Sequence, residues 1–162
     1  MVSEILVNMT AYAGGNRRDI NHFLKVYAYA RAIGRCEELS PFAQEALEIA
    51  AIVHDIACPL CREKYGSTYG PYQEAEGMVL AREFLAAFTL SPELLERVVF
   101  LVGHHHSPQL ADGPDYQILL EADYLVNAEE HGYPEEQISA ALKSLFRTAT
   151  GSALLRSVYF PA

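Results

Sequence analysis

The run from Ile49 to Ala57 constrains the fold of this chain more than any other stretch, because it is apolar except for an adjacent histidine and aspartate, His54 and Asp55. Upstream, Ser40 offers an N-cap side chain and Pro41 suits the first helical position. Apolar residues then recur at the spacing of one face of a helix: Phe42, Ala46, Ile49, Val53 and Ile56. The pattern predicts a core-facing helix with His54 and Asp55 in its last turn.

Asp55 needs a partner in such a position. Moving an ionised carboxylate out of water without compensation costs several kcal/mol or forces it to take up a proton. A divalent metal ion is the most economical way to neutralise it, because neighbouring side chains in a helical turn can both reach one ion beside the helix end. A His-Asp dipeptide is common by itself, so this interpretation depends on further ligands elsewhere in the chain.

Two other predicted helices carry polar side chains on apolar stripes. In the helix over about 18–36, His22 shares a face with apolar residues, although a core histidine bonded to a carbonyl group would explain it if it stood alone. In the helix over about 116–130, Asp123 lies in an apolar stripe and needs an explanation, whereas Glu121 falls on the other face and does not. His22 and Asp123 are therefore candidate ligands beside the His-Asp pair.

Three consecutive histidines, His104, His105 and His106, follow a helix predicted over about 91–103. Half of the chain's six histidines thus stand at one helix terminus, which is hard to attribute to packing. Contact with metal or phosphate is favoured, because imidazole ligates transition metals and titrates near neutral pH.

The segment after the His-Asp helix is predicted to be a loop over 62–71, followed by a helix over about 72–88. Loops that follow a site-bearing helix often cover the site. The cations Arg62 and Lys64 could hold a substrate phosphate, or they could be the solvated charges of an ordinary loop. The sequence leaves both interpretations open.

Pro59 is expected to end the His-Asp helix, and it lies within a Cys-x-x-Cys motif formed by Cys58 and Cys61. Such a motif serves as a redox pair or as half of a zinc site. The sequence contains no second Cys-x-x-Cys that would complete a zinc site, so two ordinary thiols are favoured.

Helical periodicity recurs along the chain and strand signals are scarce, so the predicted fold is all-α. We expect one domain over 1–162, a bundle of about six helices, because no linker or repeat divides the sequence. The functional motifs lie within 18–130, and helices over 134–160 complete the packing.

The charge balance restricts the partners. With 21 acidic and 12 basic side chains the net charge is −9, which argues against a nucleic-acid polymer or an anionic membrane as a standing partner. A small phosphorylated molecule needs only a local cationic pocket and remains compatible. No long apolar segment or signal peptide is apparent, and three cysteines fit a reducing compartment, so a cytoplasmic protein is expected.

In order and spacing, His22, His54-Asp55 and Asp123 resemble the motif of the HD superfamily of metal-dependent phosphohydrolases. Residues 50–56 and 120–125 look like the two best-known segments of that family, and the resemblance covers about 18–130. It implies an HD-type helical bundle. Further segments at 64–66, 72–74 and 103–106 look like an uncharacterised bacterial branch of the superfamily.

The resemblance implies hydrolysis of a phosphoester of a small phosphorylated substrate, often a nucleotide, by a metal-activated water. The ligands of one divalent transition metal (Mn, Fe, Ni, Co or Zn) would be His22, His54, Asp55 and Asp123. Catalytic roles are expected for Asp55, as acceptor of the water's proton, and for His104 or His105, as donors to the phosphate or the leaving oxygen. Substrate contacts are expected from Arg62, Lys64, Gln73 and His104.

One position departs from the pattern of dinuclear members of the family, in which a histidine commonly lies four residues before a glycine of the next helix. Here Gln73 precedes Gly77 at that distance. Glutamine is a poor ligand for a second transition metal, so we expect one tightly held ion. His104 and His105 would then lie near the substrate or at a weak second site.

Two other functions stay open at this stage. One is a metal-binding module that senses a nucleotide or another phosphorylated ligand without turnover. The other, which Gln73 disfavours, is a di-iron oxygenase of the HD type. The sequence does not identify the substrate or the metal, and it leaves the oligomeric state open, with a homodimer among the options.

Overall fold

The computed structural model describes residues 1–161, and every regular element in that range is helical, which confirms the all-α prediction. The α-helices are α1 (Val2–Tyr12), α2 (Arg17–Cys36), α3 (Pro41–Val53), α4 (Cys58–Tyr65), α5 (Gly70–Leu85), α6 (Pro92–Val102), α7 (Pro114–Glu130), α8 (Glu135–Ser144) and α9 (Ala149–Tyr159). A 3₁₀ turn over Pro108–Leu110 precedes α7.

The described residues thus form nine α-helices and not about six. One additional helix, α1, precedes all of the predicted elements, and a second arises because the segment over 134–160 forms two helices, α8 and α9. The third is α4, which replaces most of the expected loop over 62–71 and carries Arg62 and Lys64 in its last turn. Pro59 lies in the first turn of α4, where a missing backbone N–H costs nothing, so it opens this helix instead of ending the previous one.

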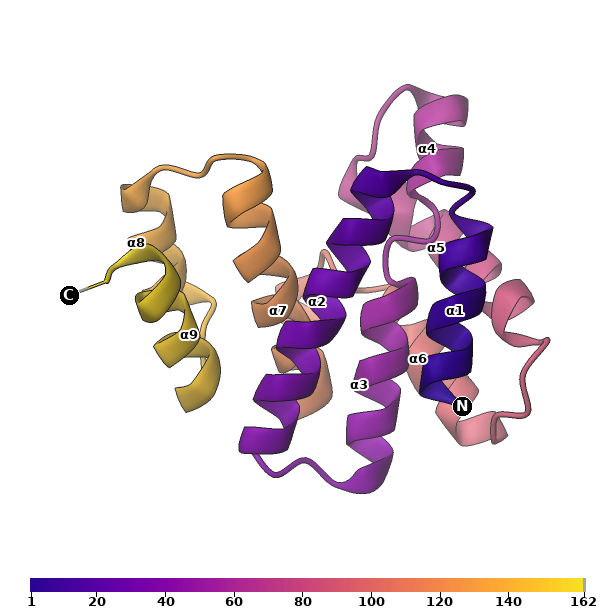
Figure 1. Ribbon diagram of the computed structural model, residues 1–162, viewed down its shortest axis with the longest axis horizontal. Coiled ribbons are helices and arrows are strands. Elements are labelled where there is room, and N and C mark those ends of the chain that lie inside the picture. The colour runs from indigo at the N-terminus through magenta and orange to yellow at the C-terminus, as the bar shows by residue number, and fades with distance from the viewer. Residues whose placement is uncertain (162) are drawn as a thin grey trace.

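Three helices form the centre of the bundle. In Figure 1, α2, α3 and α7 lie side by side, with α8 and α9 on one flank, α1, α5 and α6 on the other, and α4 at one end. Helix α3 is the most enclosed of the three, because α1, α2, α6 and α7 all pack against it. Its residues from Ala46 to Val53 are buried without interruption. No helix within residues 1–161 combines the length and apolar character needed to cross a membrane.

Glu121 corrects the expectation that its face of the helix meets solvent. Its side chain is 0 % exposed, because the segment between α8 and α9 covers that face of α7. The carboxylate accepts hydrogen bonds from the backbone N–H groups of Arg147 at 2.6 Å and Thr148 at 3.0 Å and from the side-chain amide of Gln117 at 2.8 Å. Glu121 therefore ties the last helix to the bundle.

We expect Glu121→Ala to lower the free energy of unfolding by about 3 kcal/mol, because several buried donors would lose their acceptor. Urea denaturation followed by circular dichroism measures this change. Glu129→Ala is the matched control, since that glutamate lies on the same helix with 70 % of its side chain exposed, and it should change stability by less than about 0.5 kcal/mol. Equal effects of the two substitutions would contradict the anchoring role of Glu121.

Candidate metal centre

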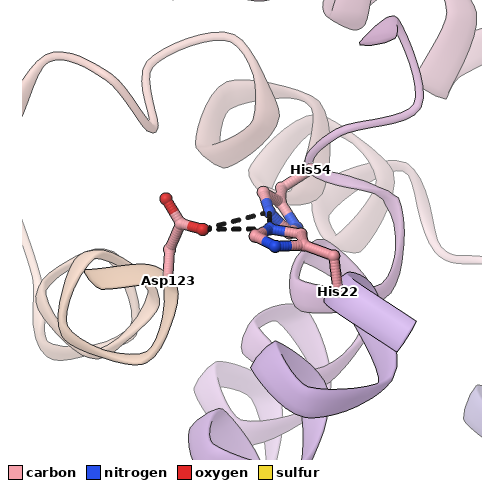
Figure 2. Close-up of side chains that lie close together, drawn as sticks. All are labelled: His22, His54 and Asp123. Atoms are coloured by element: carbon pink, nitrogen blue, oxygen red, sulfur yellow. Dashed lines mark hydrogen bonds and ion pairs between the residues drawn. The ribbon is translucent and has the colours of Figure 1, made fainter. Parts of the chain in front are cut away.

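Three side chains from the central helices converge on one point. His22 comes from α2, His54 caps the C-terminal end of α3, and Asp123 comes from α7 (Figure 2). The two Nε2 atoms are 3.2 Å apart, and Asp123 Oδ1 lies 3.2 Å from His22 Nε2 and 3.5 Å from His54 Nε2. Two imidazole nitrogens and one carboxylate oxygen at this spacing can bind one cation together.

Asp55 joins this group to a second one. The sequence predicted Asp55 in the last turn of the helix, but α3 ends at Val53 and Asp55 lies in the turn that follows. Asp55 Oδ2 lies 3.4 Å from His22 Nε2, and Oδ1 lies 3.4 Å from His105 Nε2. Asp55, His105 and His106 form a second set of ligand atoms within 4.8 Å of one another.

The imidazole rings are held with Nε2 toward the centre. The Nδ1 atoms of His54 and His105 donate to the carbonyl oxygens of Ala51 at 3.0 Å and Val102 at 2.7 Å. A carbonyl oxygen only accepts, so Nδ1 carries the proton in both rings and the lone pair of Nε2 faces the site. This is the tautomer that ligates a metal through Nε2.

Glu130 orients the third ring, and sequence reasoning missed it. His22 Nδ1 bonds Glu130 Oε2 at 2.8 Å, and Lys25 in turn holds the other carboxylate oxygen at 2.7 Å. Glu130 follows Asp123 by seven residues, which is two helical turns, so both lie on one face of α7. The seven-residue spacing from Asp123 could have predicted from the sequence that Glu130 bonds the ring nitrogen of His22 that faces away from the centre.

The pKa values of His22, Asp55 and Asp123 are shifted in the directions expected when a positive charge lies next to the two carboxylates. Burial lowers the pKa of His22, but its contacts with Asp123, Asp55 and Glu130 outweigh burial and raise the pKa to about 9. Burial likewise favours the neutral forms of Asp55 and Asp123, yet the surrounding histidines hold the pKa of both carboxyl groups below the ordinary value. The carboxylates are therefore ionised in an enclosed space.

The donor set fits a divalent transition metal. Asp123 Oδ1 and His105 Nε2 are buried and make no hydrogen bond of normal geometry among residues 1–161, and their nearest polar neighbours include His22 Nε2 at 3.2 Å and Asp55 Oδ1 at 3.4 Å. Such atoms are costly unless something else satisfies them. Imidazole nitrogens combined with carboxylate oxygens are the ligands that zinc, manganese, iron, cobalt and nickel accept. The His/Asp clusters are therefore consistent with metal binding.

The centre opens into a cavity of about 700 Å³. Of the residues singled out from the sequence, those that border it are His22, Asp55, Cys58, Arg62, Gln73, His105, His106 and Asp123. His54 is fully buried behind them. Arg18, which sequence reasoning did not select, also borders the cavity, and Arg62 is held beside it by an ion pair with Asp19.

The structure places two predicted site residues elsewhere. His104 Nδ1 bonds the carbonyl oxygen of Phe100 at 2.7 Å, and its ring stacks on the Phe100 ring at 4.3 Å, so it faces away from the cavity. Its neighbour His106 borders the cavity instead. Lys64 is exposed and pairs with Glu76 at 2.5 Å. The roles expected of His104 and Lys64 in catalysis and substrate binding therefore have no geometric support.

Gln73 and Cys58 are bound to each other and not to the centre. The Gln73 side-chain oxygen accepts from the Cys58 thiol at 3.1 Å, while its nitrogen donates to the carbonyl oxygen of Thr68 at 2.6 Å. Burial, together with the charge of Asp55, raises the pKa of the Cys58 thiol. A protonated, hydrogen-bonded thiol is a poor nucleophile, and both Cys58 and Cys61 are free and buried. This arrangement favours two ordinary thiols.

The comparisons with known proteins agree with this fold. The family model of the HD domain matches residues 19–145, so the chain belongs to the HD domain family. Among solved structures, it resembles a predicted HD superfamily hydrolase from an uncultured Thermotogales bacterium, with a TM-score of 0.69 and 22% sequence identity. That similarity covers 97% of this chain and 84% of the other. A search of curated proteins gave no match.

Proposed function

We propose that this protein is a metal-dependent phosphohydrolase that cleaves a phosphoester of a small phosphorylated molecule, with a nucleotide as the favoured class. The observation that carries the proposal is the convergence of His22, His54, Asp55 and Asp123 at one end of a cavity large enough for such a substrate. Membership of the HD domain family supports it.

The roles of the residues follow from their positions. When bound by His22, His54, Asp55 and Asp123, a divalent ion supplies a Lewis acid that lowers the pKa of water and polarises a phosphoryl oxygen. Asp55 lies between both groups of ligand atoms and accepts the proton of the attacking water. Burial lowers the pKa of His105, but its contact with Asp55 outweighs burial and raises the pKa, so the ring can also carry a proton on Nε2. In this protonated form, His105 donates a hydrogen bond to the phosphate or a proton to the leaving oxygen.

Cationic side chains at the cavity would bind the phosphate charge. Arg62 and Arg18 both border it, and a guanidinium group matches the geometry of phosphate oxygens.

We also propose that one ion is held tightly. Gln73 is engaged with Cys58 and Thr68, so Asp55, His105 and His106 alone would hold a second ion weakly.

A phosphoester screen tests the function and separates His105 from His104. The protein loaded with manganese, iron, cobalt, nickel or zinc is assayed for release of product from phosphomonoesters and phosphodiesters. Because His105 borders the cavity and His104 does not, we expect His105→Ala to lower kcat roughly 10²- to 10⁴-fold and His104→Ala to leave it within a few-fold. The melting temperature of each variant controls for folding.

Two results would contradict the proposal. Absence of turnover with every metal and phosphoester would exclude the hydrolase, and a phosphorylated ligand that raises the melting temperature without being consumed would favour the sensing module. An equal loss of kcat in the two histidine variants would overturn the assignment of His105 over His104.

A further inference from the structure

The wall of the cavity that continues from Asp123 toward the end of α7 has no role in the proposed chemistry. It is formed by Asn127, by His131 and Tyr133 after the helix, and by Tyr124 and Leu145 beside them. None of these side chains is a ligand of the candidate metal centre. The cavity thus has a polar, charged end at Asp55 and His105 and a largely aromatic wall along α7.

A glycine turn builds this wall. Gly132 adopts a φ of +61°, a conformation that favours glycine, and the chain reverses there at the end of α7. The backbone N–H of Tyr133 consequently reaches back to the carbonyl oxygen of Ala128 at 2.9 Å. The ring of Tyr133 lies nearly parallel to that of His131, at 20° and 5.9 Å, and 5.6 Å from that of Tyr124. The reversal therefore gathers flat rings at the cavity.

Asn127 adds a polar group with unused bonding capacity. It follows Asp123 by four residues, so the two lie on one face of α7, about 6 Å apart along the helix axis. Within residues 1–161 the Asn127 side chain has no hydrogen-bond partner, although it is half-buried and borders the cavity. Its amide offers a donor and an acceptor side by side.

We propose that Tyr133, His131 and Asn127 form a subsite for the flat heteroaromatic ring of the substrate, the base of a nucleoside phosphate whose phosphate lies at the Asp55 end. This inference rests on the proposed function and names the part of the substrate that gives specificity. The ring stacks on Tyr133, and the amide of Asn127 pairs with an edge that carries an adjacent donor and acceptor. A sugar phosphate would leave both features unused.

Direct binding of a nucleoside tests the subsite without turnover, because a nucleoside has no phosphate to lose. Isothermal titration calorimetry is performed on the metal-loaded wild-type protein and on Tyr133→Ala, Tyr133→Phe and Asn127→Ala. We expect Tyr133→Ala to weaken binding roughly 5- to 100-fold and Tyr133→Phe, which keeps the ring, to stay within about threefold of the wild type. Asn127→Ala should weaken binding roughly 5- to 20-fold.

Tyr12→Ala is the matched control, because that tyrosine is exposed on α1 and does not border this cavity. It should bind the nucleoside as the wild type does. If the wild-type protein does not bind the nucleoside, or if Tyr133→Ala binds it as tightly as the wild type, the subsite is wrong. Equal weakening in Tyr12→Ala would overturn it as well, since the loss would then not depend on the cavity wall.

A kinetic comparison separates the failure of this subsite from the failure of the hydrolase. Ribose 5-phosphate carries the phosphate and sugar without a base, so the ratio of kcat/KM for a nucleoside monophosphate to that for ribose 5-phosphate should fall in Tyr133→Ala, mainly through KM. If phosphate is released and this ratio does not fall, the hydrolase stands and the subsite is wrong. If nucleoside binding depends on Tyr133 and no phosphoester is cleaved, the subsite stands and the hydrolase is wrong.

Discussion

Replacing Asp55 by alanine is expected to lower phosphoester turnover by at least about 10³-fold and to release most of the bound metal. Both effects have one cause, because this carboxylate contacts His22 through one oxygen and His105 through the other. Without it the first group of ligand atoms loses an anionic ligand and the attacking water loses its proton acceptor. Steady-state kinetics and metal analysis by inductively coupled plasma mass spectrometry measure the two effects.

Two further variants show whether the loss of metal and of turnover in Asp55→Ala is specific to a proposed metal ligand. Glu130→Gln keeps all proposed ligands but weakens the hold on His22 Nδ1, so we expect a smaller loss of metal affinity, about 10- to 100-fold. Asp112→Ala removes an exposed aspartate that pairs with Arg97 away from the cavity and should leave metal content and turnover unchanged. Unaltered metal content in Asp55→Ala would remove Asp55 from the ligand set and with it the proposed mechanism.

Metal binding should raise the melting temperature of the metal-free protein by about 10 °C. An ion present at about 1,000 times its dissociation constant stabilises the folded state by about 4 kcal/mol, and a chain of this length gains 2–4 °C per kcal/mol. The gain is expected because the buried carboxylate oxygen Asp123 Oδ1 then acquires a cation as its partner. Differential scanning calorimetry with and without chelator measures it, and a shift below 2 °C for every metal tested would contradict a folded-state metal site.

The metal affinity should rise with pH. In the metal-free protein the pKa of His22 is raised to about 9, so at pH 6 to 8 its ring holds a proton that the metal must displace. The lowered pKa values of Asp55 and Asp123 keep both carboxylates ionised over that range, and they add no pH dependence. One displaced proton makes the dissociation constant about 100-fold larger at pH 6 than at pH 8, and a chelator-competition titration that found no change would contradict this linkage.

The number of ions per chain tests the inference from Gln73. Protein purified without chelator should contain close to one equivalent of transition metal. Two tightly held equivalents would mean that Asp55, His105 and His106 suffice for a second strong site. That result would restore the dinuclear and oxygen-activating alternatives, which an optical spectrum of the iron-loaded protein would then separate.

The sequence by itself determined the helical fold and the positions of His22, His54, Asp55 and Asp123 near core-facing stripes. Helical periodicity is local, and it reports which residues share a face whatever the neighbouring helices are. The cost of burying a charge then made each of these side chains conspicuous. Residues with both signals, an inward position and an uncompensated polar group, could therefore be found before the fold was known.

Only the tertiary structure decided which side chains meet. At the end of α6 the direction of each histidine depends on the turn after Gly103, and that turn sends His105 to the centre and His104 onto Phe100. Glu121 is buried because the segment before α9 packs on the far side of α7, a contact that helical periodicity within α7 does not encode. Directions at helix ends and the covering of outer faces are set by contacts between distant segments, so no local pattern predicts them.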